Sequence, residues 1–117
     1  MKLPLKEKVV HELFQGKGDI AICDIATSNM MRSRNRCFII IRLKQGDSLG
    51  VHRHEQECEI YYVMQGRGWY RDNEQEYEIQ AGEAVICQDG DSHGISNNEK
   101  EELVFIALVV SFKEVLE

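Results

Sequence analysis

The sequence predicts an all-β fold, built as a sandwich or small barrel. About ten short segments rich in β-branched and aromatic residues follow one another closely, with turn residues between them. No helical period continues beyond the first 18 residues, and the one proline, Pro4, interrupts no predicted strand. With 117 residues, 43% of them hydrophobic, the chain is long enough for one domain with its own core.

The first elements come from the N-terminal third of the chain. Residues 1–18 are predicted to form a short helix or an arm that ends at Gly16-Lys17-Gly18, and residues 19–117 to form the single domain. Strands are predicted over residues 19–26 and over 37–43 (CFIIIRL), which is rich in β-branched residues. The polar stretch 27–35 between them is predicted as a loop or an irregular edge.

The remaining strands are separated by recognisable turns. A turn at residues 55–57 separates predicted strands 51–54 and 59–64, and glycines at 66 and 68 permit a bend before 69–71. Asp72-Asn73 is a hairpin turn that leads into 75–79. Strands 84–87 and 95–97 flank a turn at 89–91, and a charged turn precedes the long strand 103–112.

Charge and cysteine content narrow the class of protein. The net charge of -6 argues against generic binding to nucleic acid or to an anionic membrane, and no apolar run reaches transmembrane length. The first eight residues are too charged and too few for a signal peptide, so we expect a cytoplasmic protein with reduced thiols. Two disulfides are the alternative for a secreted protein. The cysteines are Cys23, Cys37, Cys58 and Cys87.

Three of the four histidines fall in two short segments, GDSLGVHRHEQECEIYYVMQG (46–66) and GEAVICQDGDSHGISN (82–97). His52 and His54 are two residues apart and therefore share one face of a strand. Glu59 can face the same interior if the chain turns after His54, and His93 follows a glycine-containing turn. Imidazole and carboxylate are the ligands of first-row divalent metals, so the sequence predicts one metal site from these four residues.

These segments resemble the two motifs of the cupin family. The first motif is Gly, five residues, His-x-His, three or four residues, Glu, six residues and Gly. The second is Gly, five residues, Pro-x-Gly, two residues, His, three residues and Asn. Gln88 stands where the family has proline, and every other fixed position matches: Gly46, His52, His54, Glu59, Gly66, Gly82, Gly90, His93 and Asn97. The resemblance implies a double-stranded β-helix (jelly-roll) barrel. A cupin that keeps the barrel and has lost its metal is the alternative.

The resemblance also implies a function class. One divalent metal ion would be held in each chain. It could be iron, manganese, nickel, copper or zinc, because the ligand set does not choose among them. The protein would then be a small metal-dependent enzyme of the oxygenase, isomerase or decarboxylase type, or a non-catalytic small-molecule binding or sensing domain. In the enzyme, Glu59 could leave the metal to act as a base. Tyr61, two residues further along the same strand face, could orient or bind the substrate.

Two further expectations concern partners. An anionic substrate would need a cation at the cavity mouth, and Arg42 is the candidate, beside the cluster of Arg32, Arg34 and Arg36. Strand alternation directs Val63 inward with Tyr61, and it turns outward Ile60, Tyr62 and Met64. This outward apolar row predicts a homodimer, with cover by the N-terminal arm as the alternative.

Overall fold

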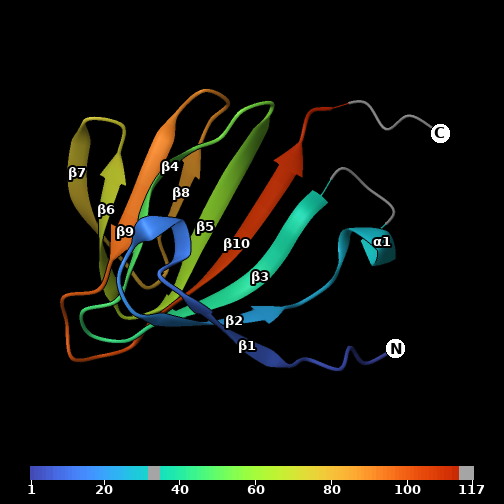
Figure 1. The fold of residues 1–117 in the computed structure, drawn as a ribbon, viewed down its shortest axis with the longest axis horizontal. Coiled ribbons are helices and arrows are strands. Elements are labelled where there is room, and N and C mark those ends of the chain that lie inside the picture. The colour runs from blue at the N-terminus through green and yellow to red at the C-terminus, as the bar shows by residue number, and fades with distance from the viewer. Residues whose placement is uncertain (32–34, 114–117) are drawn as a thin grey trace.

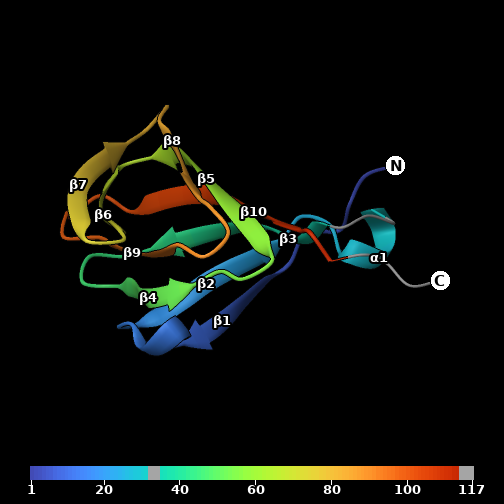
Figure 2. The same ribbon diagram turned by 90° about the horizontal axis from the view of Figure 1, so that it is seen from above.

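Two antiparallel sheets make up the fold of the computed structural model, which describes residues 1–31 and 35–113 (Figure 1). One sheet has six strands in the order β1-β2-β3-β10-β5-β8, and the other has four in the order β4-β9-β6-β7. Seen from above, the strands surround a common interior (Figure 2). The predicted all-β class is thereby confirmed.

The strands follow the predicted turns closely. The six-stranded sheet contains β1 (Glu7–His11), β2 (Asp19–Asp24), β3 (Asn35–Leu43), β10 (Leu103–Ser111), β5 (Glu57–Gln65) and β8 (Ala84–Cys87). The four-stranded sheet contains β4 (Ser48–Arg53), β9 (Ser92–Ser96), β6 (Arg67–Asp72) and β7 (Gln75–Gln80). A short helix, α1 (Ser28–Met31), lies in the segment predicted as a loop.

The N-terminal segment joins the sheet as an edge strand. β1 pairs with β2 in the register Val10↔Ile20, so residues 7–11 form a strand and not the helix that was one of two expectations. A 3-10 turn, η1 (Leu13–Gln15), then leads the chain back toward β2. The segment therefore extends the sheet beside β2.

The core lies between the sheets and is built by strand alternation. In β5, Tyr61 and Val63 are 1% and 0% exposed, whereas Ile60, Tyr62 and Met64 are 37%, 47% and 47% exposed. The predicted register of this strand is therefore confirmed. The other inward side chains belong mainly to β2, β3 and β10, namely Ile20, Ile22, Ile39, Ile41, Leu43, Leu103, Phe105 and Ala107.

Left-handed backbone conformations are concentrated in the 3-10 turn. Glu12, Phe14 and Gln15 have φ values of 47°, 53° and 63°, although none of them is glycine. Such a conformation costs on the order of 1–3 kcal/mol for each residue and persists only where the surroundings hold it. Here the turn lies against β4, where a Cβ on Gly50 would come 1.8 Å from the Phe14 carbonyl oxygen.

Candidate metal centre

Three backbone segments bring the four predicted ligands together. His52 in β4 is the cross-strand partner of His93 in β9, and His54 follows directly after β4. Glu59 faces them from β5, so both sheets contribute to the site. His54, Glu59 and His93 are 4%, 6% and 1% exposed. The site is therefore shielded from solvent.

The four side chains direct one atom each at a common point. Glu59 Oε1 lies 2.9 Å from Nε2 of His54 and 2.9 Å from Nε2 of His93. It lies 3.7 Å from Nε2 of His52. His93 Nε2 is 3.1 Å from the Nε2 atoms of His52 and His54. Within the described part of the chain, these residues form a group that could hold a metal ion, with all four atoms inside 4.8 Å of one another.

The second ring nitrogen of each histidine has a partner outside the cluster. Nδ1 of His52 lies 2.8 Å from the Gly50 carbonyl oxygen, and Nδ1 of His54 lies 2.5 Å from Glu57 Oε2. Since both partners are acceptors, these Nδ1 atoms donate, which leaves the Nε2 lone pairs directed inward. Nδ1 of His93 lies 2.9 Å from the Tyr70 hydroxyl. Such outer contacts are typical of metal-binding histidines.

Without a cation, this arrangement places hydrogen-bond acceptors against one another. Two neutral Nε2 atoms 3.1 Å apart have no hydrogen to share, and a carboxylate oxygen adds a third acceptor. Ligand atoms about 3 Å apart are what two bonds of about 2.1 Å at right angles to one ion produce. The donor set and its spacing therefore fit one divalent transition-metal ion.

The pKa of the Glu59 carboxyl group depends on the three imidazole rings around it. Burial alone would raise the pKa of Glu59, but hydrogen bonds from the three imidazoles outweigh it and hold the pKa well below its usual range. The hydrogen bond with Glu59 raises the pKa of His54, while burial lowers the pKa of His93. Because a metal ion binds the unprotonated ring nitrogens, metal binding to this cluster competes with protonation of its histidines.

A cavity of about 270 Å³ opens beside the cluster. Glu59, His54 and Tyr61 line its inner end. Burial raises the pKa of Tyr61 well above its usual value, so its phenol stays neutral. Lys8 and Asp24 also line the cavity, and they form an ion pair at 3.4 Å. The rest of the lining is apolar: Val10, Leu13, Phe14, Ile22, Cys37, Ile39, Ile41, Leu49 and Val109.

Arg42 is not brought to this site. Its neighbours in β3, Ile41 and Leu43, point into the core, so Arg42 points to the outer face of the sheet. There it forms ion pairs with Glu7 at 3.1 Å and Glu102 at 3.0 Å. The other expected cations, Arg32, Arg34 and the side chain of Arg36, lie outside the described residues.

Three contacts with the candidate ligands were not predicted. Glu57 was predicted to lie in a turn, but its side chain is 14% exposed and contacts His54. Glu57 lies two residues before Glu59 and therefore on the same strand face, so strand alternation could have indicated that it points toward the cluster. Tyr70 alternates with the exposed Trp69, so its inward direction could also have been deduced. No pattern in the sequence indicates that Phe14 would stack on a ligand.

The cysteines are not part of the cluster. All four are free. Cys87 is 2% exposed and opposes Glu59 across β8 and β5. Burial raises its pKa to about 12, so the thiolate that binds metals is not populated at neutral pH.

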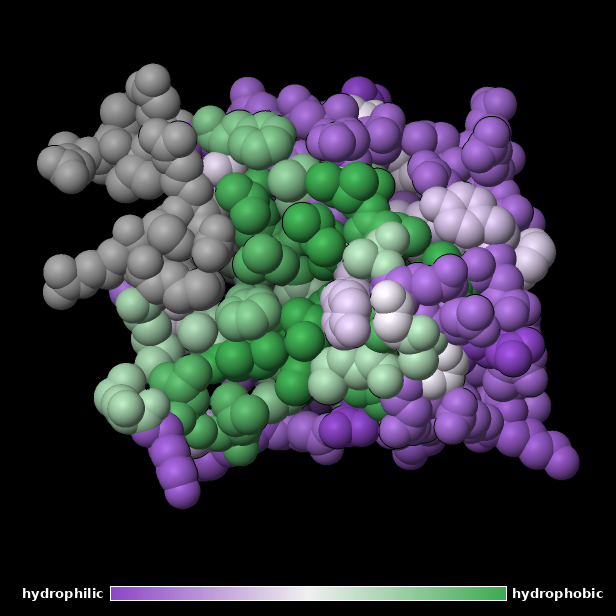
Figure 3. Space-filling model, turned by 180° about the vertical axis from the view of Figure 1, so that it is seen from behind, coloured by the Kyte–Doolittle hydropathy of each residue, from purple (hydrophilic) through white to green (hydrophobic). Residues whose placement is uncertain are grey.

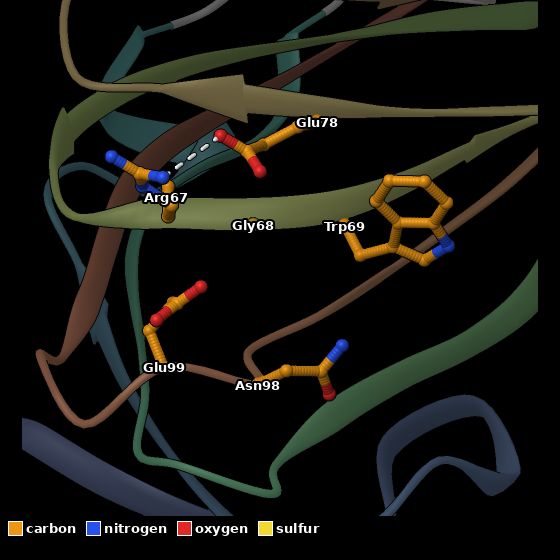
Figure 4. Close-up of a pocket in the computed structure, with 6 residues that line it drawn as sticks. All are labelled: Arg67, Gly68, Trp69, Glu78, Asn98 and Glu99. Atoms are coloured by element: carbon orange, nitrogen blue, oxygen red, sulfur yellow. Dashed lines mark ion pairs between the residues drawn. The ribbon is translucent and has the colours of Figure 1, made fainter.

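A second, smaller hollow lies where β6 meets the turn after β9 (Figure 4). Its volume of about 50 Å³ is room for one or two water molecules. The ion pair between Arg67 and Glu78, 3.3 Å long, crosses one side of it. This hollow is therefore too small for a substrate molecule.

Comparisons with known proteins agree with this geometry. The family model described as "Cupin domain" matches residues 39–110, more than half of the chain. An oxalate-binding protein from Thermotoga maritima is 35% identical over 95 residues, which are 81% of this chain and 78% of that protein. No helix in the described part of the chain has the length and apolar character needed to cross a membrane.

Solved structures show the same fold. The crystal structure of a predicted oxalate decarboxylase from Thermotoga maritima has a TM-score of 0.90 and 30% identity, covering 95% of this chain and 96% of that one. A putative sugar phosphate isomerase from Acidithiobacillus ferrooxidans has a TM-score of 0.74 and 24% identity, covering 93% and 69%. The second likeness concerns the fold alone.

Proposed function

This chain belongs to the cupin family, and we propose that it binds one divalent transition-metal ion and, on that ion, a small carboxylate anion of the oxalate class. His52, His54, Glu59 and His93 would hold the ion, which could be iron, manganese, nickel, copper or zinc. The observation that carries the proposal is the convergence of three Nε2 atoms and one carboxylate oxygen beside a cavity. When bound, the metal would supply positive charge that binds and polarises an oxygen ligand.

The class of anion is supported by the cavity and the relatives. A space of about 270 Å³ suits a small molecule, and its apolar lining contains few polar groups that could recognise a large one. One relative is named for binding oxalate, and another is described as a predicted oxalate decarboxylase. Among the described residues, Lys8 supplies a cationic side chain at the cavity, already paired with Asp24. An anion would therefore depend mainly on the metal for its charge partner.

Catalysis is the second candidate, and Tyr61 favours it. Its hydroxyl is in the cavity wall, 3.4 Å from His93 Nε2, and remains protonated. A hydroxyl at this position would orient a carboxylate on the ion. Glu59 could accept a proton if it left the metal. For oxalate the balanced reaction is oxalate plus one proton giving formate and carbon dioxide.

Metal-dependent anion binding is the decisive experiment. The chain, purified without a histidine tag, is stripped of metal, reloaded with manganese or cobalt, and titrated with oxalate by calorimetry. We expect one ion per chain and oxalate binding only in the loaded protein. His93→Ala should abolish both, whereas His11→Ala, an exposed histidine with a side chain 72% exposed, should change neither.

The outcomes separate the candidates. Oxalate binding without formate release would support a binding domain, and formate release that requires the metal would support a decarboxylase. A metal-loaded chain that binds no oxalate would refute the proposed anion, and equal metal content in His93→Ala and wild type would refute the proposed ligands.

We also propose that the protein is a homodimer. The outer face of the six-stranded sheet carries an apolar surface over β3, β10, β5 and β8, which Figure 3 shows as a broad hydrophobic area. Its cross-strand neighbours include Ile60↔Ile86, Tyr62↔Ile106 and Ile106↔Ile40. A two-fold dimer needs one such self-complementary patch on each copy. The cytoplasm is the proposed compartment, because reducing conditions suit a chain whose four cysteines form no disulfide in the described structure.

A further inference from the structure

An aromatic side chain from the N-terminal segment covers one of the candidate ligands. The rings of Phe14 and His52 are stacked, with centroids 3.7 Å apart and an angle of 12° between their planes. Phe14 also lines the cavity that Glu59 and Tyr61 line, although the residue is 48% exposed to solvent. The ring therefore stands between the metal cluster and solvent.

The turn that carries this ring is fixed to β4. Lys17 N donates to the Ser48 carbonyl oxygen at 3.2 Å, and Ser48 N donates to the Lys17 carbonyl oxygen at 2.8 Å. A Cβ on Gly16 would lie 2.1 Å from the Ser48 carbonyl oxygen, so only glycine permits this approach. The close backbone contact holds Phe14 in its left-handed conformation over the ring of His52.

We propose that Phe14 is a specificity-determining residue that closes the solvent side of the cavity and limits the bound anion to a small one. This inference rests on the proposed function, because it concerns the anion that the metal would bind. Leu13 and Phe14 form the part of the wall that comes from the 3-10 turn, while almost all of the remaining lining belongs to sheet strands. Of the strands that line the cavity, β2, β3, β5 and β10 have hydrogen-bonded neighbours on both sides and cannot move apart easily, so loss of a side chain from the turn is the simplest way to enlarge the cavity.

The expected change in anion selectivity follows from the space that the Phe14 ring occupies. Replacing Phe14 by alanine removes the whole ring and opens the cavity toward solvent. It leaves all four candidate ligands in the sequence but takes away the ring stacked on His52, so metal content is measured before anion affinity. Each methylene group that a pocket accepts or excludes changes discrimination by about 10- to 200-fold. Succinate is two methylene groups longer than oxalate. We therefore expect the ratio of the succinate Kd to the oxalate Kd to fall at least about tenfold in Phe14→Ala.

The test uses cobalt-loaded protein titrated with each anion, followed by the visible absorption of the cobalt ion. Metal content is measured first by elemental analysis and should stay at one ion per chain. Phe14→Leu, which keeps most of the bulk, should hold the ratio near the wild-type value. Val9→Ala is the matched control, because it truncates an apolar residue on the same segment that is 69% exposed and does not line the cavity.

A second variant moves the ring without changing it. Gly16 has a φ of -78°, which alanine adopts freely, so the effect of Gly16→Ala comes from the close contact of its Cβ with the Ser48 and Gly50 backbone. That contact should displace the turn and lower the Kd ratio as Phe14→Ala does. An unchanged ratio in both variants, with oxalate still bound, would overturn the role of Phe14 and leave the proposed function intact. A wild-type chain that binds neither cobalt nor oxalate would overturn both.

Discussion

Replacing Glu59 by glutamine tests the metal centre most directly. The glutamine keeps the shape of the side chain but removes the one anionic ligand of the cluster, which is 6% exposed and lies 2.9 Å from two imidazole nitrogens. Loss of an outer-shell partner alone typically weakens metal binding by about 10- to 100-fold. A direct ligand should cost at least as much, so we expect the metal Kd to rise about 100-fold, or about 2.7 kcal/mol.

Thermal unfolding converts this loss into a measurable shift. At a metal concentration about 1,000 times the wild-type Kd, binding stabilises the folded state by about 4.1 kcal/mol. A variant with a Kd about 100-fold higher gains about 1.4 kcal/mol at the same concentration. The difference of about 2.7 kcal/mol corresponds to about 10 °C in Tm for a domain of this size.

The metal-free variant provides a second readout. Because the hydrogen bonds from the imidazoles outweigh the burial of the Glu59 carboxylate, we expect glutamine to lower the Tm of the metal-free chain or to leave it unchanged. Glu55→Gln is the matched control, since the Glu55 side chain is 71% exposed and the cluster does not include it. If Glu59→Gln shows the same metal-induced rise in Tm as wild type and Glu55→Gln, Glu59 is not a ligand.

Three further substitutions probe the contact of Tyr70 with His93, the outer apolar face of the six-stranded sheet, and the core. Tyr70→Phe removes a hydroxyl 2.9 Å from His93 Nδ1 and should weaken metal binding about 10- to 100-fold by calorimetry, whereas Tyr77→Phe should leave it unchanged. Equal affinities would exclude Tyr70 from the centre. Tyr62→Lys places a charge on the outer apolar face and should convert a dimer to a monomer in light scattering at unchanged metal content; a persistent dimer would contradict this interface. Leu103→Ala empties a side chain that is 0% exposed and should cost about 2–5 kcal/mol in urea unfolding, and a loss well under that range would indicate that the site collapses around the smaller residue.

The convergence of the four candidate ligands could be predicted because it depends on short-range rules. The spacing of His52 and His54 fixes a common strand face, and Glu59 sets the phase of β5, so the inward direction of Tyr61 follows. Glu57 was missed because the strand was predicted to begin two residues too late. The same alternation, extended by one pair, places Glu57 beside His54.

Contacts between distant segments could not be predicted in this way. Phe14 reaches His52 only because a left-handed turn docks on β4, and propensity argues against that conformation for phenylalanine. Arg42 was expected at the cavity because of its charge, but its place in β3 between two buried residues decides its direction. Register thus has greater weight than chemical suitability in placing a side chain.

The charge distribution of the site explains how an acidic protein could bind an anion. The chain has a net charge of -6, and at the cavity the charge of Lys8 is neutralised by Asp24. A divalent ion bound by one carboxylate ligand, Glu59, leaves a net positive charge of one on the ligand set at the inner end of an apolar cavity, and the Glu57 carboxylate beside His54 offsets part of it. Low polarity strengthens that attraction, and the surrounding carboxylates oppose anion binding anywhere else on the surface. Anion affinity should therefore disappear with the metal, and a metal-free chain that binds oxalate as tightly as the loaded chain would refute this argument.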